Sequence, residues 1–394
     1  KLPATIGNAG QALINSSTAG TLEFGTPSAA SRNLVINGAM NVAQRATSGV
    51  TTSGYGTVDR FKSNHNGTDE AITQKQEALT SSDTGPWEKG FRNQFKLRNG
   101  NQTSGAGAGD HSNLQYRIEA QDMASSGWNY TSTSSYITLS FWVRSSVAQN
   151  FYGYLKTSDG TEQRYPFETG SLTADTWTKI TKTIPGHANL QFDINNEVGL
   201  IIVIAPFWGT NYTASGVTLN AWGAYASDTR TPDYTSTWWT TDNALFGITG
   251  VQLEVGSYAT DFEHRLYGDE LQRCKRYYQQ IVYASGNEYR LMNASVYDNS
   301  NPGAQCYGVI HFPVEMRAAP ALAGGLSGTD YWRHKRAYNG GHGSEIFDTI
   351  DLKKSSTITA ELKGSGSFDG GQNGATGTVY TNNASTSLGL DAEI

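Results

Sequence analysis

The stretch Tyr136-Ile-Thr-Leu-Ser-Phe-Trp-Val-Arg144 places Ile137, Leu139, Phe141 and Val143 at every second position. Successive side chains of an extended chain point to opposite faces, so these apolar residues share one face. A period of two is typical of a strand that lies against a core on one side. The stretch therefore predicts an antiparallel β protein.

Similar short runs occur on both sides of this strand, with Gly, Asn, Asp and Ser between them. Turn residues at such short intervals favour antiparallel sheets over long helices. Many short strands with almost no helical period indicate a β-sandwich or jelly roll. The runs are residues 33–38, 91–97, 113–119, 151–155, 177–184, 198–204 and 245–253.

One segment has a helical period instead. Asp269 can cap a helix in which Leu271, Cys274 and Tyr278 lie on one face. A second, smaller set of strand-like runs follows it, so we expect this helix to connect two domains. These later runs are residues 289–297, 305–313, 356–362, 377–380 and 386–394.

The predicted organisation is mainly β. It has a leader at 1–33, a jelly-roll domain at 34–266, a connector helix at 267–280 and a smaller β-sandwich at 281–394. The leader is rich in Gly, Ser, Thr and Ala, and its apolar pieces at 12–14 and 22–24 are too short to bury themselves. We therefore expect the leader to pack against another domain, or against copies of itself in a homotrimer.

Composition excludes several classes of function. The 394 residues carry a net charge of −6, which is unsuited to binding nucleic acid phosphates. The longest apolar run, 198–208, contains Gly199 and Pro206 and is too short to span a membrane, so no membrane insertion is expected. Cys274 and Cys306 are predicted to be free thiols, and a single bridge stays open as an alternative.

Several motifs resemble those of phage tail-fibre and related virion proteins, especially of marine and cyanobacterial phages. Residues 2–13 resemble a short repeat placed before fibre head domains. Residues 33–45, 58–61 and 140–145 resemble the opening and a core strand of a carbohydrate-module-like jelly roll. Residues 248–256, 262–265 and 271–278 resemble its closing strand and exit helix, and residues 312–320 and 388–393 resemble a small domain that often follows.

The resemblance implies a location in the virion tail, where the leader would contact other virion tail proteins. It also implies a trimer and attachment to a host surface polysaccharide. It does not fix the ligand, because the binding loops are where such proteins differ. Two alternatives stay open: a purely structural virion decoration, such as a capsid fibre or neck protein, and a glycan-degrading tailspike.

The sequence favours a protein without catalytic activity. A glycosidase needs two carboxylates at a defined separation, but the acidic residues are scattered and the histidines are dispersed singly. Glu254 and Glu263 are expected to pair with Arg45, Arg60 or Arg265, because a half-buried charge needs a partner. No cofactor is predicted; a structural Ca²⁺ held by Asn33, Asn37 and Asp261 stays open.

Aromatic residues between positions 206 and 239 give the predicted glycan site. Sugar rings present an apolar face and hydroxyl groups, so their sites combine an exposed aromatic plate with polar side chains. The segment has the composition of a long loop, in which aromatic residues tend to be partly exposed. The candidates are Trp208, Tyr212, Trp222, Trp238 and Trp239, with a second group, Tyr331, Trp332 and Arg333, in a cationic loop of the smaller domain.

Overall fold

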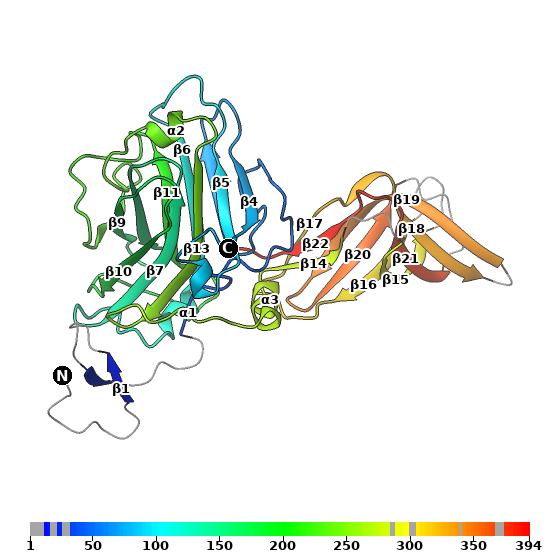
Figure 1. Ribbon diagram of the computed structural model, residues 1–394. Helices are drawn as coiled ribbons and strands as arrows, with labels where there is room; N and C mark the ends of the chain where they lie inside the picture. Colours follow the sequence, from blue (N-terminus) through cyan, green and yellow to red (C-terminus); the bar gives the residue numbers. More distant parts are fainter. Residues whose placement is uncertain are drawn as a thin grey trace. The chain divides into compact units, whose positions relative to one another are not determined.

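A computed structural model describes residues 12–15, 22–25, 32–283, 288–298, 305–338, 341–366 and 374–394 (Figure 1). It confirms a mainly β protein built from antiparallel sheets. The chain divides into two compact units, Lys1–Tyr267 and Gly268–Ile394. No helix in the described part is long and apolar enough to cross a membrane.

A five-stranded sheet forms one layer of the first unit. Its strands, in order across the sheet, are β10 (Thr178–Pro185), β7 (Tyr136–Ser145), β13 (Leu245–Val255), β5 (Asn93–Arg98) and β4 (Thr73–Ala78). β7 is the strand with the alternating pattern, and it pairs with β10 on one side and β13 on the other.

A six-stranded sheet forms the second layer (Figure 1). Its order is β12 (Gly223–Ala224), β9 (Gln163–Ser171), β8 (Asn150–Thr157), β11 (Val198–Trp208), β6 (His111–Glu119) and β3 (Phe61–Asn66). One core joins the two sheets: Phe141 of β7 contacts Phe167 of β9, with ring centroids 6.3 Å apart. The first unit is therefore the predicted β-sandwich.

The remaining elements of the first unit are short. α1 (Ala120–Ala124) follows β6 directly, the 3-10 helix η1 spans Trp87–Lys89, and α2 spans Thr237–Thr240. β1 (Ala12–Asn15) and β2 (Leu22–Gly25) pair as a hairpin. The rest of the predicted leader, 1–11, 16–21 and 26–31, lies outside the described residues.

The second unit differs from the sandwich that the sequence predicts. Six strands close into a barrel in the order β15 (Arg290–Asp298), β16 (Gln305–His311), β20 (Thr359–Ser365), β19 (Gly341–Ser355), β18 (Ser327–Tyr338) and β21 (Thr376–Thr381). β21 pairs with both β15 and β18, which closes the sheet. A three-stranded sheet of β14 (Tyr278–Val282), β22 (Leu388–Asp391) and β17 (Ala321–Ala323) accompanies it.

The predicted helix is shorter than expected. α3 spans Tyr267–Lys275, and its Cys274 is buried. Tyr278, expected on the same helical face, instead begins β14 and pairs with Asp391 of β22. Sheet pairing thus replaces the last helical turn, and Tyr278 is still buried.

Candidate functional site

The outward face of β7 carries the candidate site. Its inward residues Ile137, Leu139, Phe141 and Val143 are fully buried in the core, as predicted. The residues between them must point the other way, and Trp142 is half-buried on the outer face of the five-stranded sheet. An indole left partly open on an outer sheet face is available to a ligand.

A groove of about 590 Å³ opens beside Trp142. Lys179 lies directly across from Trp142 on β10, and Lys179 is exposed. The volume lies within the range of known small-molecule sites. The groove is lined by Glu88, Lys89, Gly90, Phe91, Ser140, Trp142, Lys179, Gly250, Asp261, Phe262 and His264. We call this feature the Trp142 groove.

An aromatic group forms one wall of the Trp142 groove. The Phe91 ring centroid lies 4.8 Å from that of Phe262 and 5.1 Å from that of His264. His264 Nε2 lies 2.8 Å from the Lys89 carbonyl oxygen. Gly250, with a φ of +63°, leaves room for this wall, because a Cβ there would lie 2.6 Å from the Phe91 ring.

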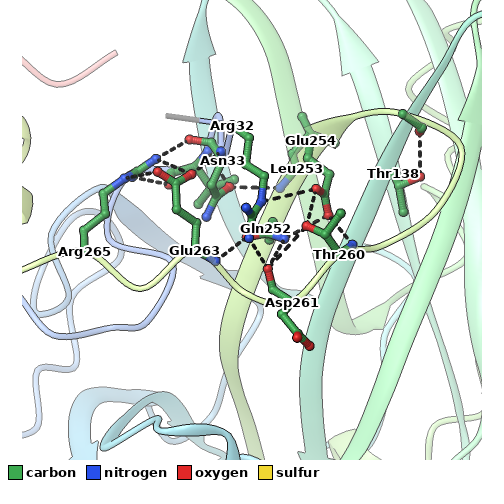
Figure 2. A network of polar contacts seen from close by, with 12 residues as sticks. Arg32, Asn33, Thr138, Gln252, Leu253, Glu254, Thr260, Asp261, Glu263 and Arg265 are labelled. Carbon is green, nitrogen blue, oxygen red and sulfur yellow. Dashed lines mark hydrogen bonds and ion pairs between the residues drawn. The ribbon is translucent and has the colours of Figure 1, made fainter. Parts of the chain in front are cut away.

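A buried polar network holds the segment that carries this wall (Figure 2). Glu254 is 2% exposed and accepts hydrogen bonds from Thr260 N at 2.9 Å and from Gln252 Nε2 at 2.8 Å. Gln252 Oε1 accepts from Glu263 N at 2.8 Å. Figure 2 shows the Asp261 carboxylate directed away from this network. The network therefore fixes residues 260–263 on β13 while leaving Asp261 to the groove.

The expected pairing of the two glutamates is half right. Glu263 forms the predicted ion pair with Arg265, Nε to Oε1, at 3.4 Å. Glu254 forms an ion pair with Arg32, Nε to Oε2, at 3.6 Å, and Arg32 was not among the predicted partners. Sequence spacing gave no sign of Arg32, because 222 positions separate it from Glu254 and only the packing of β13 brings them together.

A second cavity of about 380 Å³ lies on the same sheet face, beside Arg144. Asp83 lines this cavity and accepts hydrogen bonds from Trp177 Nε1 and Arg144 Nη1, both at 3.0 Å, and from Thr80 N at 2.8 Å. Burial raises the pKa of Asp83, but the hydrogen bonds from Trp177 and Thr80 and the charge of Arg144 outweigh it and hold the pKa below its ordinary value. Gly85, two residues on, packs against the Trp142 indole. Through these bonds Asp83 holds the loop around residues 83–85 against the sheet, next to the Trp142 groove.

Two of the predicted aromatics pack together on the opposite sheet. The Trp208 and Tyr212 rings are 5.1 Å apart, and Arg230 Cζ lies 4.5 Å from the Trp208 ring centroid. The His111 ring also stacks on Trp208, with ring centroids 4.9 Å apart. Trp208 is only 3% exposed, so the expected exposure is wrong for it, because β11 extends to Trp208 and neighbouring side chains cover the ring.

Trp238 and Trp239 are fully buried in the sandwich core. Both lie in α2, where Trp238 Nε1 donates to the Leu245 carbonyl at 3.1 Å and Trp239 Nε1 donates to the Gly105 carbonyl at 2.9 Å. Their predicted role as exposed plates is therefore wrong in this structure, since neither ring has a free face.

Trp222 is half-buried and borders a pocket of about 330 Å³ that also includes Arg164 and Thr229. Its Nε1 donates to the Pro185 carbonyl at 2.7 Å, and its ring packs on Tyr165. Trp222 therefore anchors its loop while part of the ring stays open, and it keeps its place as a candidate.

The predicted group in the smaller domain lies in strand β18 and not in a loop. Trp332 is fully buried inside the barrel, where its Nε1 donates to the Leu326 carbonyl at 2.9 Å, so it is not a ligand-stacking residue here. Tyr331 is half-buried. Arg333 lies on the outer face and forms an ion pair with Glu288 at 2.8 Å. Because side chains alternate along a strand, Trp332 points into the barrel, whereas its neighbour Arg333 points outward.

Two of the side chains considered for calcium, Asn33 and Asn37, already bind the backbone. Asn33 Oδ1 accepts from Val35 N at 3.0 Å and Leu253 N at 3.1 Å, and Asn37 Oδ1 accepts from Val42 N at 2.9 Å. The Asp261 carbonyl, not its carboxylate, accepts from Arg32. Within the described ranges no group of three or more His, Cys, Asp or Glu side chains is placed to hold a metal.

Cys274 and Cys306 are thiols without a disulfide, as predicted, and both are buried. Burial raises the pKa of the Cys306 thiol to about 12, so the thiolate is scarce at neutral pH.

Sequence reasoning missed Trp142 although the signal was present. Phe141 and Trp142 are adjacent, and a strand cannot bury both against the same core. The alternation that places Phe141 inside thus places Trp142 outside. The remainder of the groove, from residues 88–91 and 261–264, is brought to β7 only by tertiary packing.

Comparison with known proteins finds structural similarity without sequence similarity. No family model and no curated protein matches the chain. A tailspike protein 4 enzymatically active domain of bacteriophage CBA120 is 10% identical over 57% of this chain, with a TM-score of 0.30, and only 22% of its own length is covered. A family 11 carbohydrate-binding module of a Clostridium thermocellum cellulosomal cellulase is 11% identical over 56% of this chain and 99% of its own, with a TM-score of 0.23.

A family 61 carbohydrate-binding module, solved with β-1,4-galactotriose, is 12% identical over 58% of this chain and 100% of its own, with a TM-score of 0.26. All three similarities concern the fold alone. The site must therefore be judged by its own residues.

Proposed function

We propose that the first unit binds a glycan in the Trp142 groove, and that the chain is a tail-fibre subunit through which a phage attaches to its host. One observation carries the binding part: a half-buried indole borders a 590 Å³ groove among charged and hydroxyl side chains. The sequence motifs that resemble those of tail-fibre proteins support the virion part.

The chemistry of the groove suits a sugar. Stacking a pyranose face on the Trp142 indole removes apolar area of both from water. Ser140, Lys179 and Asp261 supply a hydroxyl, an ammonium and a carboxylate that can exchange hydrogen bonds with ring hydroxyls. An apolar plate with a few polar groups around it is the usual composition of a small-molecule site.

The proposed activity is binding without cleavage. Glu88 and Asp261 both line the groove, so a hydrolase is the alternative to be measured. We expect purified polysaccharide to keep its length after incubation with the protein, as judged by size-exclusion chromatography and reducing-end assay. Cleavage that disappears in the Glu88→Gln and Asp261→Asn variants would establish the enzyme instead.

The groove is tested by comparing two tryptophans of similar exposure. The full chain is titrated against lipopolysaccharides and exopolysaccharides purified from cyanobacteria and other marine bacteria. Trp142→Ala should weaken binding by about tenfold, because it removes the stacking surface. A tenfold loss corresponds to roughly 1.4 kcal/mol of binding free energy.

Trp222→Ala is the matched control, because Trp222 is also half-buried but lies outside the groove. Trp222→Ala should lower the thermal midpoint about as much as Trp142→Ala does, but it should leave glycan binding unchanged. Loss of binding in Trp222→Ala alone would move the site to the loop predicted from the sequence, and equal losses in both would reject the groove.

A further inference from the structure

The outer face of the barrel brings three cationic side chains around one tyrosine. Arg290 of β15 and Arg333 of β18 both lie directly across from Tyr380 of β21, one on each side. Lys335 lies two residues beyond Arg333, on the same outer face. The inward residues of the same strand, Trp332 and His334, are fully buried. In the closed barrel, Arg333 and Lys335 therefore lie on the outer face of β18, and Trp332 and His334 lie inside.

Contacts around the ring hold these groups together. Arg290 Nη2 donates to the Tyr380 hydroxyl at 3.2 Å, and its Cζ lies 5.7 Å from the ring centroid. Lys335 Nζ lies 5.1 Å from the same centroid. Glu288 binds both Arg333, at 2.8 Å, and Lys335. We call Glu288, Arg290, Arg333, Lys335 and Tyr380 the Tyr380 cluster.

The Tyr380 cluster has an excess of positive charge. Three cations face one carboxylate, in a chain whose net charge is −6. The side chains of Arg333 and Lys335 are 28% and 40% exposed, and Arg290 is exposed. The two residues directly across from Lys335, Thr378 and Ser344, are uncharged, and the Thr378 hydroxyl donates to Asn293 Oδ1 at 3.0 Å. A local excess of guanidinium and ammonium groups attracts anions.

We propose that the Tyr380 cluster is a second binding site, separate from the Trp142 groove, for the carboxylate or sulfate groups of an acidic polysaccharide. Arg290, Arg333 and Lys335 bind the anionic groups, and Arg333 and Arg290 can do so with two parallel N–H donors. The Tyr380 ring and the amide and hydroxyl groups of Asn293 and Thr378 contact the sugar. Glu288 holds two of the cations in place and limits the net charge.

The composition of the site favours a polysaccharide over nucleic acid. Tight binding to duplex DNA takes a stripe of basic residues that neutralises many phosphates. The Tyr380 cluster offers only three basic side chains, and they lie beside neutral hydrogen-bonding groups suited to sugar hydroxyls.

The test uses the full chain with three probes: alginate for carboxylates, dextran sulfate for sulfates, and unmodified dextran as the neutral reference. We expect binding to at least one anionic probe, weakening as salt is added, and none to dextran. Arg290→Ala and Lys335→Ala should each weaken that binding by about tenfold, as expected for a lost hydrogen bond to a charged group. Glu288→Gln should strengthen it, because it removes the one opposing charge.

Lys353→Ala is the matched control, because Lys353 is an exposed cation on β19 outside the cluster. It should leave affinity unchanged. Equal losses in Lys353→Ala and Lys335→Ala would show a general charge effect and overturn the proposal, as would weaker binding in Glu288→Gln, no binding to either anionic probe, or stronger binding to duplex DNA. Trp142→Ala should leave binding to the anionic probe intact, so failure of the groove and failure of this site can be told apart.

Discussion

At the scale of single residues, Asp83 decides how the loop beside the Trp142 groove is held. It is 9% exposed and accepts hydrogen bonds from Trp177, Arg144 and Thr80. Asp83→Asn keeps the shape but removes the charge, and an unsatisfied buried donor typically costs about 1–3 kcal/mol. We expect a lower thermal midpoint and weaker glycan binding, with Thr84→Ala, an exposed neighbour, as the control.

The same carboxylate predicts a pH dependence. Its pKa in the folded chain lies below the ordinary value, so the unfolded chain takes up the proton first as the pH falls. The stabilisation by Asp83 is therefore complete above the ordinary Asp pKa of about 3.9 and is lost as the pH falls through the lower folded value. Thermal midpoints of wild type and Asp83→Asn should differ at neutral pH and converge in strong acid. A constant difference across that range would contradict this account.

Trp238 shows how burial reverses an expectation drawn from composition. An aromatic residue in a loop-like segment suggested a surface plate, but α2 turns the ring into the core, where it is 0% exposed. Trp238→Ala should cost about 3–5 kcal/mol of unfolding free energy, the usual range for a core tryptophan. Chemical denaturation measures this directly. A change below about 0.5 kcal/mol, the usual size for an exposed site, would be inconsistent with burial.

At the scale of elements, the irregularity in β13 matters most for the groove. The register of β13 against β7 shifts between Thr249 and Gln252, and Gly250 lies in the shift with a positive φ. Gly250→Ala would place a Cβ 2.6 Å from the Phe91 ring and displace the aromatic wall. We expect both a lower midpoint and weaker glycan binding.

Gly127→Ala provides the comparison, because Gly127 also has a positive φ but no atom lies within 4 Å of its Cβ position. That variant should show the backbone cost alone, with glycan affinity unchanged. If both variants bind equally well, the Phe91 wall does not contribute to the site.

Strand alternation made much of the sandwich predictable. The inner face of β7 follows directly from Ile137, Leu139, Phe141 and Val143. β18 was missed, because Arg333, Lys335 and Arg336 read as a solvated loop, whereas the barrel holds Arg336 in an ion pair with Glu345 at 2.7 Å. Pairing with β19 and β21 decides this strand, and such long-range pairing leaves little trace in local sequence.

At the scale of the whole molecule, we propose that the chain is a homotrimer. β1 and β2 form a sheet of two four-residue strands, and an isolated hairpin of this size is marginal in water. Packing against other copies would stabilise it. Light scattering on residues 1–394 should give three times the chain mass, and removal of residues 1–31 should lower it. A stable monomer at micromolar concentration would argue decisively against the trimer.

The closed barrel has a consequence for crowding. An open sheet presents a row of unpaired backbone groups at each edge, and such rows recruit strands from neighbouring molecules. Each of the six barrel strands that the structure describes has a partner on both sides. The five-stranded sheet does end in open strands, but β10 carries Lys179 and Lys182 and finishes at Pro185, which has no N–H to donate. The barrel and the β10 edge therefore offer little to which a strand of a neighbouring copy could add.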